Sequence, residues 1–145
     1  MTPSRGLESV LNLHRLRRRV LKQLLAALAA QRQDLVASLR ALDAERGEVL
    51  RWNRAALAQA GPVEGQSLTE GWLLAAAKRE AALKARVAEL EAQSEDASKR
   101  LVAASQDLKM LARLTERRRL RELRESERRE QKEMDAWSGY AQVTL

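Results

Sequence analysis

The 145-residue sequence contains no cysteine, no phenylalanine and a single histidine, and aromatic residues make up only 3% of it. The absence of cysteine excludes a disulfide framework and thiolate chemistry, and it fits a reducing compartment. A single histidine, His14, cannot build a Ser-His-Asp triad or a histidine-based metal site. The sequence also has no glycine-rich phosphate loop. We therefore expect a protein that is not an enzyme and that binds no metal or cofactor.

Proline and glycine are also scarce, with two prolines and six glycines in the whole chain. The segment between Ala60 and Leu68 holds Pro62, Gly61 and Gly65, and it interrupts an otherwise continuous helical pattern. This segment is the one predicted turn. The predicted organisation is one helical domain, 1–145, with a helix at 7–60, a turn at 61–67, a longer helix at 68–137 and a frayed tail at 138–145 that begins at Ser138 and Gly139.

The residues that are abundant are strong helix formers, mainly Ala, Leu, Arg, Glu and Gln, and 32% of the chain is charged. Both predicted helices carry a ladder of mostly apolar residues that recurs every seven positions, as in a coiled coil. The first ladder is Leu7, His14, Leu21, Leu28, Leu35, Leu42, Val49 and Ala56. The second ladder is Ala76, Leu83, Leu90, Ala97, Ala104 and Leu111.

The two ladders predict an all-α fold, an antiparallel two-helix coiled-coil hairpin with a longer C-terminal helix. Residue n is expected to lie opposite roughly residue 128 minus n, so that Leu42 comes near Val87. By this register the second helix overhangs from about Glu122 onward. His14 falls on the first ladder, where a polar residue most simply helps to set the register of the pair.

Two tryptophans stand out close to the predicted turn in a chain that is poor in aromatic residues. The expected register places Trp52 near Ala76 and Trp72 near Ala56. Packing across the pair is the simpler interpretation of both side chains, and anchoring of a partner is the alternative. The two roles are compatible.

The formal net charge is +7, and 11 Lys/Arg against 5 Asp/Glu up to Ala60 give the first helix a net charge of +6. Such a surface suits nucleic acid, an anionic membrane or an acidic protein pore. The expected register brings a second basic cluster opposite the first, at the open end of the hairpin. The first cluster is Arg15, Arg17, Arg18 and Arg19, and the second is Arg113, Arg117, Arg118, Arg119 and Arg121.

The leucines at 21, 28, 35 and 42 follow directly on the first basic cluster, which is the layout of a basic-region zipper that grips the DNA major groove. The basic stretch is short and lacks a base-reading asparagine. A second helix of the same chain is also available to pack against these leucines. A zipper-type nucleic-acid binder and a generic coiled-coil tether stay open as alternatives.

Two segments resemble the central-stalk proteins of type III secretion, FliJ in flagella and the YscO family in injectisomes. The first is VLNLHRLRRRVL at 10–21, and the second is ERREQKEMDAWSGYA at 127–141. Within the second segment Gln131, Lys132, Met134 and Asp135 are similar to a QK-x-MDE-like ending of that family. Ala136 stands where flagellar members carry an acidic residue, which favours an injectisome member.

The resemblance implies a non-enzymatic stalk that inserts into a hexameric secretion ATPase, promotes its assembly or turnover, and links it to the membrane-embedded export gate. It also implies a cytoplasmic protein at the inner membrane, monomeric on its own, with export chaperones as further partners and no nucleic acid bound. The implied gate-binding residues are Val49, Trp52, Trp72 and Ala76. The implied ATPase-binding residues are Arg15, Arg17, Arg18, Arg19, Arg117, Arg118 and Arg119.

Overall fold

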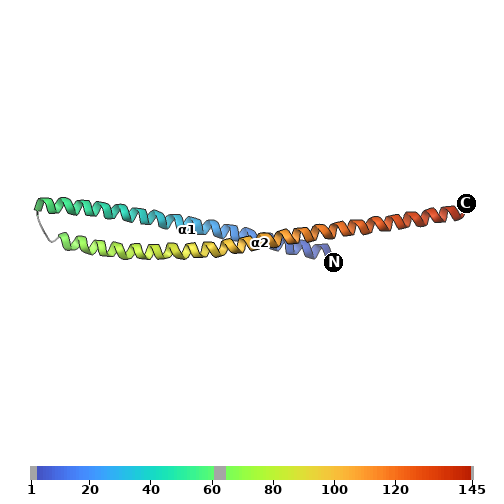
Figure 1. Cartoon of the computed structure of the whole chain (residues 1–145), viewed down its shortest axis with the longest axis horizontal. Helices are drawn as coiled ribbons and strands as arrows, with labels where there is room; N and C mark the ends of the chain where they lie inside the picture. Colours follow the sequence, from blue (N-terminus) through green and yellow to red (C-terminus); the bar gives the residue numbers. More distant parts are fainter. Residues whose placement is uncertain (1–2, 61–64, 145) are drawn as a thin grey trace. The chain divides into compact units, whose positions relative to one another are not determined.

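A computed structural model describes residues 3–60 and 65–144, and every one of these residues is α-helical. Helix α1 spans Pro3–Ala60 and helix α2 spans Gly65–Thr144 (Figure 1). Proline at the start of α1 is tolerated because the first N–H groups of a helix have no acceptor within the helix. The expected all-α, antiparallel two-helix hairpin with a longer second helix is confirmed. The predicted turn residues Gly61 and Pro62 lie outside the described residues.

The helix ends differ from the expected ones. Helix α1 begins four residues before the predicted start at Leu7, and α2 begins at Gly65, inside the predicted turn. At the other end α2 continues through Ser138 and Gly139, so the frayed tail predicted for 138–144 is wrong. Gly139 does not adopt the left-handed conformation that a glycine needs to end a helix. Inside a helix it lowers stability by about 1 kcal/mol relative to alanine, which weakens the helix without breaking it.

By their packing the helices divide into two compact units. Unit 1 combines Met1–Arg19 with Leu101–Leu145, and unit 2 is Val20–Arg100. In each unit a segment of α1 packs against a segment of α2 that runs in the opposite direction. Neither helix contains, among its described residues, a stretch long and apolar enough to cross a membrane.

The core of unit 2 consists of ladder residues from both helices. Leu90 is fully buried, and it forms a cluster with Leu28 and Ala97 against which Leu25 and Leu35 pack. Leu42 and Ala76 are buried as well. A small residue such as Ala97 next to leucines lets the two helices approach closely. The seven-residue ladders therefore identified the buried faces correctly.

The pairing of the two helices in unit 2 differs from the expected register. Arg46, expected opposite residue 82, forms an ion pair with Glu80. Arg32, expected opposite residue 96, forms an ion pair with Glu91, with 3.0 Å between Nη2 and Oε1. In both ion pairs the α2 partner precedes the expected residue, by two positions for Glu80 and by five positions for Glu91. A ladder that repeats every seven residues defines the packing face, and side-chain sizes and ion pairs then select among neighbouring alignments.

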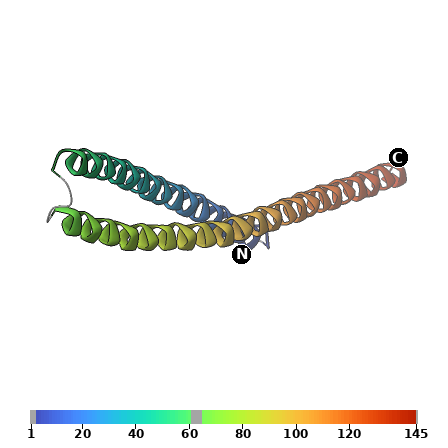
Figure 2. The ribbon, with the colours of Figure 1, turned by 60° about the vertical axis from the view of Figure 1, so that its left-hand side comes forward.

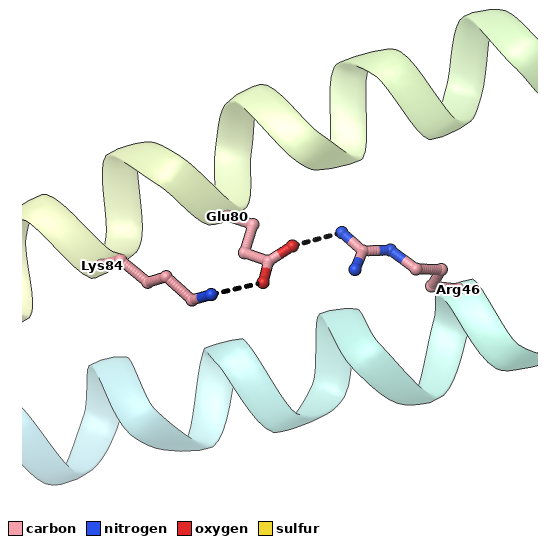
Figure 3. Close-up of polar contacts among 3 residues, drawn as sticks. All are labelled: Arg46, Glu80 and Lys84. Atoms are coloured by element: carbon pink, nitrogen blue, oxygen red, sulfur yellow. Dashed lines mark hydrogen bonds and ion pairs between the residues drawn. The ribbon is translucent and has the colours of Figure 1, made fainter.

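Glu80 is the centre of a small ion-pair network in unit 2 (Figure 3). One carboxylate oxygen accepts a hydrogen bond from Arg46 of α1, and the other lies 2.9 Å from Lys84 Nζ, one turn further along α2. The hydrogen bonds from Lys84 and from Arg46 lower the pKa of Glu80 to about 2. This carboxylate stays ionised over most of the acidic range, and it connects the two helices of unit 2.

Unit 1 has a shorter core, to which α2 contributes Ala104 and Leu108 as buried residues. The α2 segment beside the start of α1 ends near Glu122, which lines a small groove together with Leu7. Beyond this point every residue from 123 to 141 is exposed. We call residues 123–144 the overhang, the part of α2 that continues past the paired part of unit 1 (Figure 2).

Candidate functional site

The positive charge of the chain is concentrated in unit 1. This unit carries 15 Lys/Arg and 9 Asp/Glu, a net charge of +6, whereas unit 2 carries 12 and 11, a net charge of +1. Within unit 1 the paired residues 3–19 and 101–122 hold 11 Lys/Arg and 4 Asp/Glu, a net charge of +7, and the overhang holds 4 and 5, a net charge of −1. The excess of positive charge therefore lies on the paired part of unit 1.

Six of the seven arginines predicted to bind the ATPase are exposed, and Arg18 is half-buried. Arg119 pairs with Glu116, one turn before it on α2, with 3.4 Å between Nη2 and Oε1. The other six arginines form no ion pair within residues 3–60 and 65–144. Their charge is thus available to a partner, because an exposed and unpaired guanidinium has only its hydration to lose.

The two basic clusters do not lie opposite each other as the sequence predicted. A groove in unit 1 brings Arg118 and Arg119 of α2 next to Leu7 and Glu8 of α1. A second groove brings His14 next to the α2 residues Asp107, Met110, Leu111 and Leu114. The α2 cluster is thus displaced toward the start of α1, and Glu8 lies beside it. The carboxylate of Glu8 offsets part of the positive charge that Arg118 and Arg119 bring to this groove.

His14 lies at the seam, which is the line of ladder residues along which the two helices pack. Its place in the first ladder predicts this position. It is half-buried and lies against Leu111 in unit 1, and its Nδ1 atom is buried without a hydrogen-bond partner in the described part of the chain. A buried and unsatisfied ring nitrogen costs about 1–3 kcal/mol. No three His, Asp or Glu side chains among the described residues gather closely enough to hold a metal ion.

The four residues predicted to bind the export gate fall into two pairs. Ala76 is buried and Val49 is half-buried, so both belong to the seam between the helices of unit 2. Trp52 is 64% exposed, and Trp72 is half-buried. Packing across the pair is therefore the wrong interpretation of Trp52. The tryptophans can contact a partner directly, whereas Val49 and Ala76 hold the helices that carry them.

Trp52 and Trp72 lie on the same side of unit 2. Trp52 lies three positions after the ladder residue Val49. Thr69 is buried and lies one heptad before the ladder residue Ala76, and Trp72 lies three positions after Thr69. Equivalent flanking positions of two antiparallel helices face the same side of the seam. The shifted register also brings the two positions to nearly the same level along the pair.

One exposed residue of this surface was missed by the sequence prediction. Leu68 precedes Trp72 by four residues, which places both on one face of α2, and it is more exposed than Trp52. The prediction began the second helix at Leu68 and assigned this side chain no role. Because α2 begins at Gly65, Leu68 already lies within the helix, and its spacing from Trp72 was the signal that could have revealed it. Trp52, Leu68 and Trp72 are called the tryptophan surface below.

The leucines of the zipper alternative are used within the chain. Leu28 and Leu42 are buried in unit 2, and Leu35 packs against the cluster that contains Leu90. A basic-region zipper needs these positions for a second copy of the same helix. The intramolecular pairing therefore gives the zipper alternative no support.

Comparison with known proteins agrees with the resemblance noted in the sequence. The family model described as Flagellar FliJ protein matches residues 4–142, nearly the whole chain. No curated protein and no solved structure matches the chain. The description of the matching family is flagellar, so it lends no support to the preference for an injectisome member that Ala136 suggested.

Proposed function

The chain belongs to the FliJ family of flagellar and type III export components, and on this basis we propose that it is the central stalk of a type III secretion ATPase complex. Unit 1 enters the hexameric ATPase and promotes its assembly or turnover. The tryptophan surface of unit 2 contacts the export gate. The chain itself catalyses no reaction and works on the cytoplasmic side, at the inner membrane.

The observation that carries the proposal is the net charge of +7 on the paired part of unit 1. Six unpaired arginines there suit an acidic pore, because opposite charges accelerate association and set the orientation of the bound partner. The proposed contact residues are Arg15, Arg17, Arg18, Arg19, Arg117, Arg118 and Arg119. The overhang, with its net charge of −1, is not expected to contribute to this attraction.

A two-helix stalk inside a sixfold ring must contact the six subunits differently. Its basic residues lie at some positions around the helix pair and not at others, so different subunits experience different fields. A ligand shifts a conformational equilibrium only through a difference in its affinity for the two states. We infer that this unequal contact favours different nucleotide states in different subunits and so raises ATP turnover.

At the other end the proposal assigns gate binding to Trp52 and Trp72, supported from within by Val49 and Ala76. Large exposed aromatic side chains are frequent anchors of protein interfaces. The leucine seam is occupied within the chain, which supports a monomer in the absence of partners. Export chaperones are further proposed partners, without an assigned surface.

The test is stimulation of the cognate hexameric ATPase by a triple variant, Arg117→Glu, Arg118→Glu and Arg119→Glu. Each reversal turns an attraction to the acidic pore into a repulsion, so we expect the stimulation curve to shift to about tenfold higher stalk concentration or more. The matched control is the triple variant Arg40→Glu, Arg54→Glu and Arg79→Glu, which makes the same charge change at exposed positions of unit 2.

The control variant should stimulate the ATPase like the wild type. Equal loss of stimulation in both triple variants would mean that only the net charge of the chain matters. Unchanged stimulation in the unit 1 variant would remove the electrostatic basis of the proposal. Circular dichroism checks that both variants remain helical. The reversed residues are exposed, so helix formation should be preserved.

A further inference from the structure

Unit 1 contains an open groove of about 370 Å³ between α1 and α2. It is lined by His14, Asp107, Met110, Leu111 and Leu114. Leu111 and His14 belong to the seam and form the floor. Met110 and Leu114 are each more than half exposed although both are large and apolar. The groove is thus an apolar surface on a part of the chain that is otherwise strongly basic.

The α1 side of the groove is extended by Val10 and Leu13. Val10 precedes the seam residue His14 by four positions, as Asp107 precedes the seam residue Leu111. Equivalent flanking positions of antiparallel helices face the same side of the pair. Val10 and Leu13 therefore lie on the face of α1 that is next to the groove, although the groove itself is lined on α1 by His14. Both side chains are exposed, Leu13 by 60%.

The charges around the groove are mostly positive. On α1, Arg17 follows Val10 and Leu13 on the same helix face. On α2, Arg117 and Arg121 follow Met110 and Leu114 at helical spacing. Asp107 is the one acidic residue that lines the groove. An apolar strip between basic flanks is complementary to a helix whose apolar face is bordered by carboxylates.

We propose that this groove is a docking site for an amphipathic α-helix with acidic flanks, supplied by a partner protein. The groove between two packed helices accepts a third helix in the way that ridges of side chains pack into grooves. Val10, Leu13, Met110 and Leu114 contact the apolar face of the bound helix. Arg17, Arg117 and Arg121 contact its carboxylates. This site shares Arg17 and Arg117 with the proposed ATPase contact. It goes beyond the stalk function, because binding of the helix requires neither the ATPase nor the export gate.

The test uses the full chain and a fluorescein-labelled designed peptide of about 18 residues, which is five helical turns. The peptide carries leucines at i, i+3, i+4 and i+7 and glutamates at the flanking positions. A second peptide has the same composition in scrambled order, and a third has lysines in place of the glutamates. Fluorescence anisotropy gives the affinity of each peptide, and we expect the acidic amphipathic peptide to bind at least tenfold more tightly than either control.

The groove is distinguished from the rest of unit 1 by a pair of matched variants. Leu13→Ser combined with Met110→Ser should weaken binding of the acidic peptide by about tenfold or more. The control is Leu16→Ser. Leu16 is 54% exposed and lies two residues after His14, on the face of α1 opposite the groove. This substitution should leave binding of the acidic peptide unchanged.

Three outcomes would overturn the proposal. The first is equal binding of the scrambled acidic peptide, which would reduce the effect to net charge. The second is equal loss of affinity in the Leu16→Ser variant, and the third is unchanged affinity in the Leu13→Ser, Met110→Ser variant. None of these measurements involves the ATPase, so the docking site and the stalk function can fail independently.

Discussion

Arg46 of α1 and Glu80 of α2 form an ion pair across unit 2, with Lys84 bound to the second carboxylate oxygen of Glu80 (Figure 3). The pair joins residues that are 34 positions apart in the sequence. It lies close to the ladder residues Val49 and Ala76, on the part of unit 2 that carries the tryptophan surface. We expect it to stabilise the alignment of the two helices at that end.

The first prediction concerns acid stability. The pKa of Glu80 falls from the ordinary 4.5 to about 2 in the folded chain. A lowered pKa in the folded chain contributes stability that is fully present above pH 4.5. This stability is lost as the pH falls toward 2, because the carboxylate takes up its proton at a higher pH in the unfolded chain than in the folded chain. Thermal unfolding followed by circular dichroism should therefore show a loss of stability between pH 4.5 and 2.

The control for this prediction is the variant Glu80→Gln, which cannot ionise. It should be less stable than the wild type at pH 7, and the difference between the two should shrink as the pH falls through this window. Glu89→Gln makes the same substitution in an exposed ion pair within α2. A difference between wild type and Glu80→Gln that stays constant from pH 7 to 2 would contradict the prediction.

The second prediction concerns the core of unit 2. Leu90→Ala removes the one fully buried large side chain in the described part of the chain, so unfolding in urea should require about 2–5 kcal/mol less free energy. Leu74→Ala makes the same substitution at an exposed position of α2, and its effect should stay within about 0.5 kcal/mol. Similar losses for both variants would contradict the prediction, because Leu→Ala does not lower helix propensity and only the burial of Leu90 distinguishes the two sites.

The third prediction concerns the tryptophan surface. Trp52→Ala and Trp72→Ala should each weaken binding to the export gate by about thirtyfold, the effect of removing an interface anchor worth about 2 kcal/mol. The Trp52 variant should remain helical, because this side chain is mostly exposed. Leu68→Ser should weaken gate binding as well. The affinities can be measured by surface plasmon resonance on the cytoplasmic part of the gate protein.

The control for gate binding is Trp137→Ala, which replaces an even more exposed tryptophan in the overhang of unit 1. Its gate affinity should equal that of the wild type. If Trp52→Ala unfolds the chain, Trp52 is a core residue after all. If Trp52→Ala and Trp72→Ala bind the export gate as tightly as the control Trp137→Ala, the gate contact lies elsewhere.

The fourth prediction concerns the solution state. A chain whose leucine seam is occupied by its own second helix should sediment as a monomer of 16.3 kDa at moderate salt. A zipper would sediment as a dimer, and the dimer would strengthen with concentration. Sedimentation velocity over a tenfold concentration range distinguishes the two. A wild-type chain that sediments as a dimer over this range would contradict the prediction.

Much of the fold follows from local features of the sequence. The seven-residue ladder from Leu28 to Leu42 and its counterpart through Leu90 and Ala97 identified the buried faces, because a helix brings residues of that spacing to one side. Helix formers without interior proline determined the length of the helices. The concentration of arginines in the paired part of unit 1 was also visible as two clusters in the sequence.

Other features depended on contacts between distant residues. The alignment of the helices was decided by pairs such as Arg46 with Glu80, because a repeating ladder permits several neighbouring registers. The exposure of Trp52 and the apolar groove around Met110 are likewise features of the packed helices. The sequence by itself determined which faces are apolar and where the charge lies. Only the tertiary structure decided which apolar side chains stay uncovered, because burial depends on what the opposite helix places against each of them.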